Sequence, residues 1–304
     1  MADLTGLWVT TVTPFGADEG VDLETARKHA AFLARAGITR LVPGGNTGEA
    51  SSLEPFEVVE LVRVTRESAP EALVVAGVGG ALPTALSLTR ESLAAGADGV
   101  MVHHPAHTHL GRRGLEAYYR AIAGAADGRA LLYKLTHRVP DELVVSLVRE
   151  RAVWGVKYAV RDLAAFQRAR EQAPEGVWIC GTAELWAPFF HQLGADGFTS
   201  GLANAAPVLA LAMEEALAAG DLARALELRE LARPFEELRA EEDAAKNVPA
   251  VRSIVELAGF RCGPPRPPLA PLEPADEERV RQVWAAWVEQ GFAAAAEPVG
   301  TPRS

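Results

Sequence analysis

The chain has 304 residues, and its 30 Lys and Arg against 40 Asp and Glu leave a formal net charge of −10 at pH 7. Hydrophobic residues at 49% and charged residues at 23% exclude bulk disorder. The acidic charge argues against nucleic acid and anionic membranes as partners, and no apolar run is long enough to span a membrane. Two cysteines cannot form a disulfide framework. Because the first residues include acids where a signal peptide is basic, we expect a cytoplasmic protein.

Short β-branched runs alternate with amphipathic helical stretches. Asp22 is expected to cap the first helix and Gly37 to close it. The expected strands are Leu7–Val12, Ile38–Val42, Leu73–Gly77, Val100–His103, Ala130–Leu135, Val153–Ala159, Val177–Cys180 and Gly197–Ser200. The expected helices after the first are Pro55–Glu67, Pro83–Ala95, Gly114–Ala125, Asp141–Arg149, Asp162–Gln172, Glu184–Leu193 and Pro207–Ala219.

This alternation predicts eight strand–helix units. Strands that alternate with helices form parallel βαβ units, and eight such units in about 220 residues favour a (β/α)8 TIM barrel, in the α/β class, over an open sheet. The strands stop after Gly220, and helices at Leu222–Ala240, Val251–Ala258 and Ala275–Trp287 predict a C-terminal three-helix extension. We therefore expect a catalytic barrel over residues 1–220, a helical extension over 221–292 and a disordered tail over 293–304.

Lys157 lies in the sixth expected strand, near the end where barrel enzymes place reactive groups. Two-residue alternation places it on the same face as Gly155 and Ala159, which leave room for a ligand. Desolvation favours the neutral amine, the form that attacks a ketone to give a Schiff base. The same position also suits a lysine that extends to solvent or to a structural carboxylate, and the pattern leaves both interpretations open.

Tyr133 is expected at the equivalent height of the preceding strand. A phenol beside an imine-forming lysine can transfer the protons of carbinolamine dehydration and carbon–carbon cleavage, although a tyrosine in a strand, taken alone, more often packs in the core or at the rim. Its neighbour Lys134 has the opposite parity and is expected to face the helix layer.

A glycine-rich loop follows the second expected strand. Its glycines expose backbone N–H groups, and Asn46 and Thr47 add side-chain donors, so the loop could hold a carboxylate. A plain tight turn has the same composition. We expect Glu49 to be a charge at a helix start rather than an acid catalyst.

Four histidines crowd seven residues at the end of the fourth expected strand: His103, His104, His107 and His109. Such a group could bind a divalent metal. However, the run contains no carboxylate, and adjacent side chains of a strand point to opposite faces. We therefore assign no metal site and expect these histidines to contact substrate or solvent.

Several segments, taken in order, resemble one family. They are Thr13–Phe15, Gly45–Glu49, Tyr133, Lys157 after Gly155-Val156, and Gly197–Asn204. The ordered set resembles the dihydrodipicolinate synthase / N-acetylneuraminate lyase family of class I aldolases. Residues 266–269 (RPPL) resemble the family's crossing between its last helices, so that the resemblance covers roughly residues 5–290.

The resemblance implies a (β/α)8 barrel with a helical extension, assembled as a homotetramer (a dimer of dimers). It implies that Lys157 forms a Schiff base with pyruvate or a related 2-oxo acid and that Tyr133 transfers protons. Thr47, with the backbone around Asn46 and Gly48, would bind the keto-acid carboxylate. Neither a cofactor nor a catalytic metal is implied.

The part that would receive the second substrate departs from the synthases of the family. Asn46 stands for the first threonine of their Gly-Thr-Thr-Gly-Glu loop, and His103–His107 lacks their tyrosine. Tyr133–Thr136 replaces their Tyr-Asn-x-Pro segment. Arg138 would occupy the place where they bind the carboxylate of the aldehyde partner. His107 and Thr199 complete the expected substrate-binding residues.

These departures favour a lyase that cleaves or dehydrates a 2-oxo sugar acid through a lysine Schiff base. The motivation is the intact core of Lys157, Tyr133 and Thr47 beside a polar, histidine-rich aldehyde side. The resemblance places the segment 181–184 (GTAE) where sugar-acid members carry substrate-facing residues. Three alternatives remain open. The first is dihydrodipicolinate synthase (4-hydroxy-tetrahydrodipicolinate synthase), which condenses pyruvate with aspartate semialdehyde. The others are a metal-dependent aldolase that uses the histidines and a non-catalytic homologue that binds a 2-oxo acid.

Overall fold

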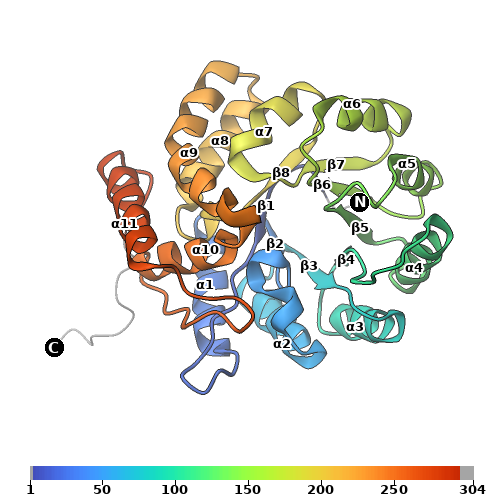
Figure 1. Ribbon diagram of the computed structural model, residues 1–304, viewed down its shortest axis with the longest axis horizontal. Helices are drawn as coiled ribbons and strands as arrows, with labels where there is room; N and C mark the ends of the chain where they lie inside the picture. Colours follow the sequence, from blue (N-terminus) through green and yellow to red (C-terminus); the bar gives the residue numbers. More distant parts are fainter. Residues whose placement is uncertain (1–2, 295–304) are drawn as a thin grey trace.

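Eight parallel strands close into a barrel in chain order, each paired with its neighbours and β8 with β1, in the computed structural model, which describes residues 3–294. Figure 1 shows the ring of strands with helices around it. The predicted (β/α)8 barrel is therefore confirmed. The strands are β1 (Gly6–Thr10), β2 (Arg40–Val42), β3 (Leu73–Val78), β4 (Gly99–Val102), β5 (Ala130–Lys134), β6 (Gly155–Tyr158), β7 (Val177–Cys180) and β8 (Gly197–Ser200).

Helices α1 to α8 follow the strands in turn, and α9 to α11 come after the barrel. Short 3-10 turns η1 (Asn46–Gly48) and η2 (Ala50–Ser52) follow β2, and η3 (Leu202–Asn204) follows β8. The helices are α1 (Leu23–Arg35), α2 (Pro55–Ser68), α3 (Leu82–Ala94), α4 (Arg112–Ala125), α5 (Asp141–Arg149), α6 (Leu163–Gln172), α7 (Ala183–Gln192), α8 (Pro207–Ala218), α9 (Leu222–Ala244), α10 (Asn247–Leu257) and α11 (Pro274–Glu289). Non-helical backbone at residues 241–243 interrupts α9.

Local sequence signals set most helix ends. The Asp22 side chain accepts a hydrogen bond from the Thr25 backbone N–H (3.0 Å), which confirms the predicted cap. Gly37, with φ +102°, supplies the left-handed residue just after the end of α1. The helix expected at Val251–Ala258 begins four residues earlier, because Pro249 lies in the first turn of α10, where its missing N–H has no intrahelical partner to lose.

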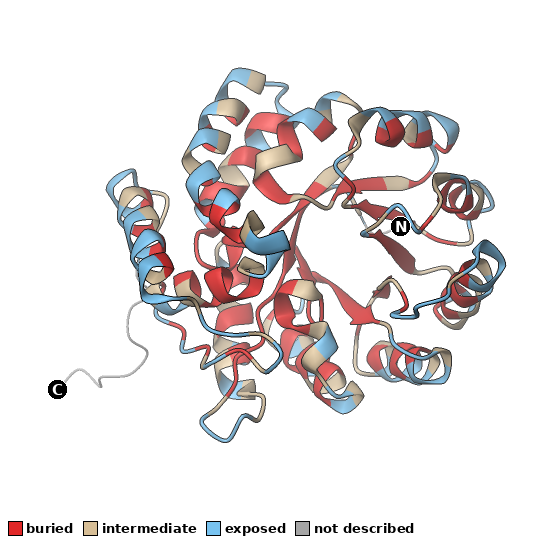
Figure 2. Cartoon of the chain, in the orientation of Figure 1, coloured by how far each residue is buried: buried red, intermediate tan, exposed pale blue. Residues whose placement is uncertain are grey.

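Strand side chains alternate between the barrel interior and the helix layer. Trp8, Val75, Met101 and Ile179 belong to a buried cluster that also includes Tyr133. Buried residues line the strands and the inner faces of the helices, whereas the outer helix faces are exposed (Figure 2). The predicted orientation of Lys134 is confirmed, because its Nζ lies 3.2 Å from the Asp141 carboxylate at the start of α5.

The extension covers one side of the barrel and contacts the loops at its mouth. Helix α9 packs against α7 and α8, and α10 packs against both η1 and η3. The predicted tail over 293–304 falls, from residue 295 onward, outside the described residues. Within residues 3–294, no helix is both long and apolar enough to cross a membrane.

Candidate active site

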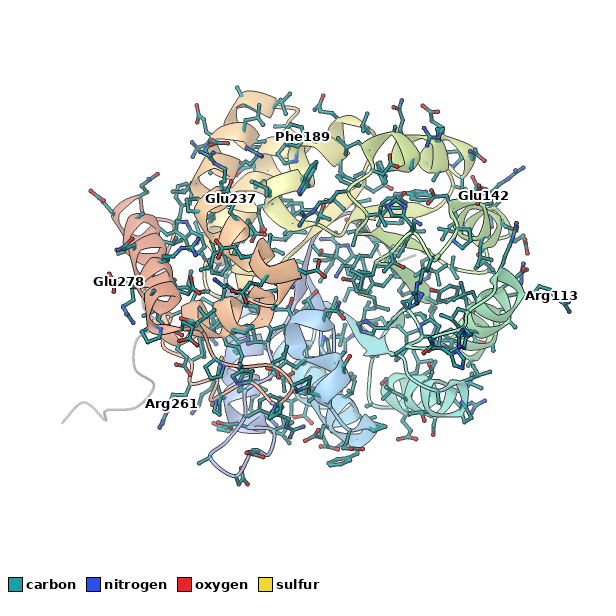
Figure 3. All side chains as sticks on the ribbon, viewed as in Figure 1. Arg113, Glu142, Phe189, Glu237, Arg261 and Glu278 are labelled. Carbon is teal, nitrogen blue, oxygen red and sulfur yellow. The ribbon has the colours of Figure 1, made fainter. Side chains whose placement is uncertain are left out.

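Lys157 lies in β6 and points into the barrel mouth, as two-residue alternation predicts. The register of β5 and β6 pairs it directly with Tyr133, and its Nζ lies 4.2 Å from the centroid of the Tyr133 ring. A Cβ at Gly181, the residue after β7, would lie 3.0 Å from Lys157 Cγ, so glycine leaves the space that the lysine stem occupies. Side chains fill the middle of the ring (Figure 3).

The surroundings of Lys157 favour its neutral amine. Burial and, to a smaller extent, the positive charge of Arg239 together lower the pKa of Lys157 to about 8, whereas Cys180 opposes the shift. At pH 7 an amine with this pKa is neutral in about one molecule in ten, compared with a few in ten thousand for an ordinary lysine. Lys157 is therefore suited to attack a carbonyl carbon near neutral pH.

Tyr133 is held as a protonated phenol beside that amine. Burial raises the pKa of Tyr133 to about 12, although the Asn46 hydrogen bond and the charge of Arg239 favour the phenolate. The Asn46 side chain donates to the Tyr133 hydroxyl (3.1 Å) and thereby fixes its position. A buried phenol with one fixed donor can give a proton to a reacting group and then take one back.

His103, one of the four clustered histidines, lies edge-on to Tyr133, with ring centroids 5.7 Å apart. Its Nε2 donates to the Gly44 carbonyl oxygen (3.3 Å). Burial and the Lys157 charge lower the pKa of His103 to about 4, so its ring is neutral at pH 7. A cavity of about 530 Å³ opens beside Asn46, His103 and Tyr133 and offers room for a substrate.

The loop after β2 is drawn tightly against β1. The Gly48 carbonyl oxygen accepts a hydrogen bond from the Thr13 hydroxyl (2.7 Å), and a Cβ at Gly48 would lie 2.6 Å from the Thr11 carbonyl oxygen. Thr47 is buried, and the Gly48 N–H already donates to Gly45 (3.0 Å). These contacts fix the conformation of the loop and hence the position of the buried Thr47, the residue after Asn46.

Glu49 is not the helix-start charge that the sequence predicts. Its backbone is left-handed (φ 60°), and its side chain is fully buried between two arginines of the extension. One carboxylate oxygen lies 2.6 Å from Arg252 Nη1, and the other accepts from the Arg266 backbone N–H (3.0 Å). The prediction was wrong because both partners lie more than 200 residues away, where no local pattern could reveal them.

The structure brings together part of the predicted set. Lys157, Tyr133 and Asn46 are linked by the contacts given above, and Thr47 and Gly48 belong to the same loop as Asn46. Thr199 pairs in register with Trp8, whose side chain lies in the interior cluster, so Thr199 also points inward.

Two other predicted residues lie on exposed loops: His107 after β4 and Arg138 after β5. His107 accepts a hydrogen bond from the His109 backbone N–H (3.1 Å). Over residues 3–294, no group of three or more His, Cys, Asp or Glu side chains is arranged to hold a metal ion.

Sequence reasoning missed the charged residues that α9 brings to the mouth. Arg239 and Glu236 are 8% and 6% exposed and form a salt bridge with each other. A signal was present, because Arg239 continues the buried spacing of Leu228, Ala232 and Phe235 along α9. A charge on the buried face of a helix requires a partner, and here the helix carries it to the end of β8.

Comparison with known proteins gives consistent relatives over nearly the whole chain. The model described as the dihydrodipicolinate synthetase family matches residues 3–286. A 4-hydroxy-tetrahydrodipicolinate synthase from Natronomonas pharaonis is 32% identical over 291 residues, which cover 92% of this chain and 97% of the relative. A Streptomyces coelicolor protein named probable 5-dehydro-4-deoxyglucarate dehydratase 1 is 35% identical over 283 residues, which cover 90% of this chain and 88% of the relative.

Solved structures that resemble this chain include members of the same family. The dihydrodipicolinate synthase of Bacillus clausii superposes with a TM-score of 0.90 at 37% sequence identity, covering 93% of this chain and 97% of the other. The names of the relatives describe two different reactions: synthesis of 4-hydroxy-tetrahydrodipicolinate and dehydration of 5-dehydro-4-deoxyglucarate. The choice between these reactions therefore depends on the residues at the mouth.

Proposed function

Because this chain belongs to the dihydrodipicolinate synthetase family, and is a lyase of the class I aldolase type, we propose that Lys157 forms a Schiff base with a 2-oxo acid and that Tyr133 transfers the protons. The pairing of Lys157 with Tyr133 across β5 and β6 carries this proposal. A buried amine with a lowered pKa and a buried phenol with a raised pKa are the nucleophile and the acid that imine formation requires.

The chemistry follows from these two states. The neutral amine attacks the keto carbon and gives a carbinolamine, whose hydroxyl leaves as water with the proton of Tyr133. The resulting phenolate then removes a proton from the carbon next to the iminium carbon, which gives an enamine and restores the phenol. The hydroxyl of Thr47 would hold the carboxylate of the 2-oxo acid, with help from backbone N–H groups of its turn other than those of Gly48 and Glu49, which donate within the loop.

We propose a 2-oxo sugar acid as the substrate. Glu184, in the first turn of α7, is fully buried, and neither of its carboxyl oxygens makes a hydrogen bond of ordinary geometry with a described residue. Buried polar atoms without partners are rare, and hydroxyl groups of a substrate would satisfy these oxygens. The relative named probable 5-dehydro-4-deoxyglucarate dehydratase 1 supports the same class of substrate.

Condensation of pyruvate with aspartate semialdehyde is the second candidate, because several relatives carry that enzyme's name. Arg138, which the family resemblance assigns to the carboxylate of the aldehyde, is exposed in this structure.

Borohydride trapping tests the Schiff base. The protein is reduced in the presence of pyruvate, and the modified peptide is found by mass. We expect one adduct, on Lys157, that is absent from Lys157→Met and present in Lys28→Ala, a change at a half-exposed lysine on α1. No adduct on Lys157 with pyruvate or with longer 2-oxo acids would refute the proposal.

Product analysis then separates the two candidates. With 2-oxo-3-deoxygluconate and 5-dehydro-4-deoxyglucarate, we expect either release of a smaller 2-oxo acid or loss of water. Turnover with pyruvate and aspartate semialdehyde, and none with the sugar acids, would instead establish the condensation.

The homotetramer and the cytoplasmic location remain predictions. Light scattering should give four times the 32.3 kDa of one chain. A value of one chain mass would contradict the tetramer.

A further inference from the structure

A buried charge cluster lies between α7, the end of β8 and α9. It consists of Glu184 (0% exposed), Glu236 (6%) and Arg239 (8%). Neither the imine-forming step nor the carboxylate site uses these side chains. Buried charged groups are costly unless paired, so the cluster calls for a specific explanation.

Arg239 is fixed from several directions. Its Nη1 donates to the Glu236 carboxylate, and its Nε and Nη2 donate to the Asn247 side-chain oxygen at 3.0 and 2.8 Å. The guanidinium lies against Gly201, just after β8, where a Cβ would come within 2.7 Å of Arg239 Cζ. The guanidinium of Arg239 therefore pairs with Glu236, and Glu184 forms no ion pair with a residue that the structure describes.

The charge balance places a proton on Glu184. Two buried carboxyl groups share one guanidinium, and like charges in a common site raise the pKa of at least one of them. Burial raises the pKa of both groups, and the negative charge of Glu236 raises that of Glu184 further. Arg239 and the nearby Ser200 hydroxyl favour the ionised form of Glu184 but do not outweigh burial.

The cluster faces the same mouth as the amine. Glu184 follows Gly181, the residue that packs on the Lys157 stem, by three positions. Glu184 lies four residues after the end of β7, and β7 pairs with β6 in a register that sets Ile179 beside Lys157, so both side chains come from the same end of the barrel. The charge of Arg239 acts on Lys157, Tyr133 and Glu184 alike.

Other charged and titratable groups act at this end of the barrel. The charge of Lys157 acts on His103, just after β4, and the charges of Glu184 and Lys157 act on Cys180 at the end of β7. The charge of Arg161, three residues after the end of β6, acts on Glu236.

We propose that Glu184 is the proton donor to the hydroxyl that leaves a 2-oxo sugar acid, so that this lyase dehydrates its substrate rather than cleaving it. The inference rests on the Schiff-base function proposed above. In the enamine, the electron pair expels the hydroxyl two carbons from the former keto carbon. That hydroxyl leaves as water with the proton of Glu184. Hydrolysis of the unsaturated iminium then frees the Lys157 amine and the product and returns a proton to Glu184.

The protonation state decides between the two outcomes. Cleavage of the carbon–carbon bond requires removal of the proton from that same hydroxyl, and hence a base beside it. Dehydration requires that a proton be added, and hence an acid. A carboxyl that stays protonated near neutral pH favours dehydration.

The test uses Glu184→Gln and a matched control, Glu237→Gln. Glu237 is the exposed neighbour of Glu236 on α9 and is labelled in Figure 3. For Glu184→Gln we expect kcat for dehydration of 5-dehydro-4-deoxyglucarate or 2-oxo-3-deoxygluconate to fall about 10²- to 10⁴-fold, with KM within twofold. Pyruvate trapping on Lys157 and deuterium exchange of the pyruvate methyl group should stay within twofold, because both precede the step that uses Glu184.

Several results would overturn the inference. Unchanged kcat in Glu184→Gln would do so, as would a raised KM with normal kcat, which indicates that Glu184 only binds hydroxyls. Wild-type turnover by cleavage without loss of water would also overturn it. Absence of the Lys157 adduct in the wild type is a different result, which refutes the Schiff base itself.

If Glu184→Gln does not fold, the variant Glu236→Gln provides an independent test. Glu236→Gln removes the neighbouring negative charge and frees Arg239, so the pKa of Glu184 should fall. Because Glu184 acts as an acid, the alkaline limb of kcat for dehydration should move to lower pH in Glu236→Gln and stay in place in Glu237→Gln. An unmoved limb in Glu236→Gln would contradict the role of Glu184.

Discussion

The ion pair of Arg252 with Glu49 should be a principal support of both stability and pyruvate binding. The side chains of Arg252 and Glu49 are 3% and 0% exposed, with Nη1 and Oε1 2.6 Å apart. Arg252 also donates to the carbonyl oxygens of Thr13 (2.7 Å) and Gly263 (2.8 Å). Arg252→Met keeps the volume of the stem and leaves Glu49 as a buried carboxylate whose cation is missing.

The expected loss follows from that burial. Removal of one partner of a buried ion pair costs about 3–5 kcal/mol. With an unfolding entropy of about 2.1 cal/mol/K per residue, a chain of this length loses roughly 1.6 °C of Tm per kcal/mol. The Tm of Arg252→Met should therefore fall by about 5–8 °C.

The deficit should depend on pH in a defined direction. Burial raises the pKa of Glu49, and the Arg252 charge opposes that rise. Without Arg252 the folded pKa rises further above the unfolded value, so the folded state binds more protons and stability falls as pH rises between the two values. The difference in Tm between Arg252→Met and the wild type should thus be smaller at pH 5 than at pH 8.

Thermal unfolding at matched scan rates measures the stability, and trapping at increasing pyruvate concentrations measures the site. Because Glu49 follows Thr47 and Gly48 directly, we expect the half-saturating pyruvate concentration to rise in Arg252→Met. Arg279→Met, at an exposed ion pair with Glu241, should cost less than about 1 kcal/mol. Glu49→Gln combined with Arg252→Met should recover part of the Tm. A single variant as stable as the wild type at pH 8 would refute the reasoning.

Three further outcomes follow from the groups around Lys157. The initial rate of pyruvate imine formation should rise about tenfold per pH unit below pH 7 and level off near pH 8, since the neutral amine is the nucleophile; a rate that keeps rising to pH 10 would show an ordinary lysine. Tyr133→Phe should slow turnover about 10²- to 10⁴-fold in stopped-flow assays and leave pyruvate binding nearly unchanged, because it removes only the proton donor. Asn46→Ala should slow imine formation about 2- to 10-fold, the worth of one neutral hydrogen bond to the Tyr133 hydroxyl; an equal rate would separate that bond from catalysis.

The barrel and its lysine were within reach of the sequence because their signals are local. The strand Val177–Cys180 and the helix Asp141–Arg149 have the predicted bounds, since turn and cap residues flank each of them. Two-residue alternation alone placed Lys157 inward and Lys134 outward, and the structure confirms both orientations. The direction in which a strand side chain points can be predicted from its position in the strand alone, without knowing which residues it contacts.

The charged partners from the extension had no such signal. Arg252 lies 203 residues from Glu49, and a pairing over that distance depends on how α10 docks on η1. Arg239 carried a partial signal, its place on the buried face of α9, but that face does not say which loop it meets. Sequence periodicity shows that a helix is buried, whereas the docking of one element on another decides its neighbour.

The extension is therefore part of the proposed reaction site rather than only a cover for the barrel. Helix α10 brings Arg252 to the carboxyl group of Glu49, and α9 brings Arg239, paired with Glu236, whose charge acts on Glu184. A barrel without these helices would keep Glu184 and Glu49 but lose the cation that holds Glu49 and the charges that act on Glu184. The loop of Thr47 and the field at Lys157 would then change together, although neither residue belongs to the extension. Changes in α9 should consequently alter proton transfer, and changes in α10 should alter binding of the keto acid.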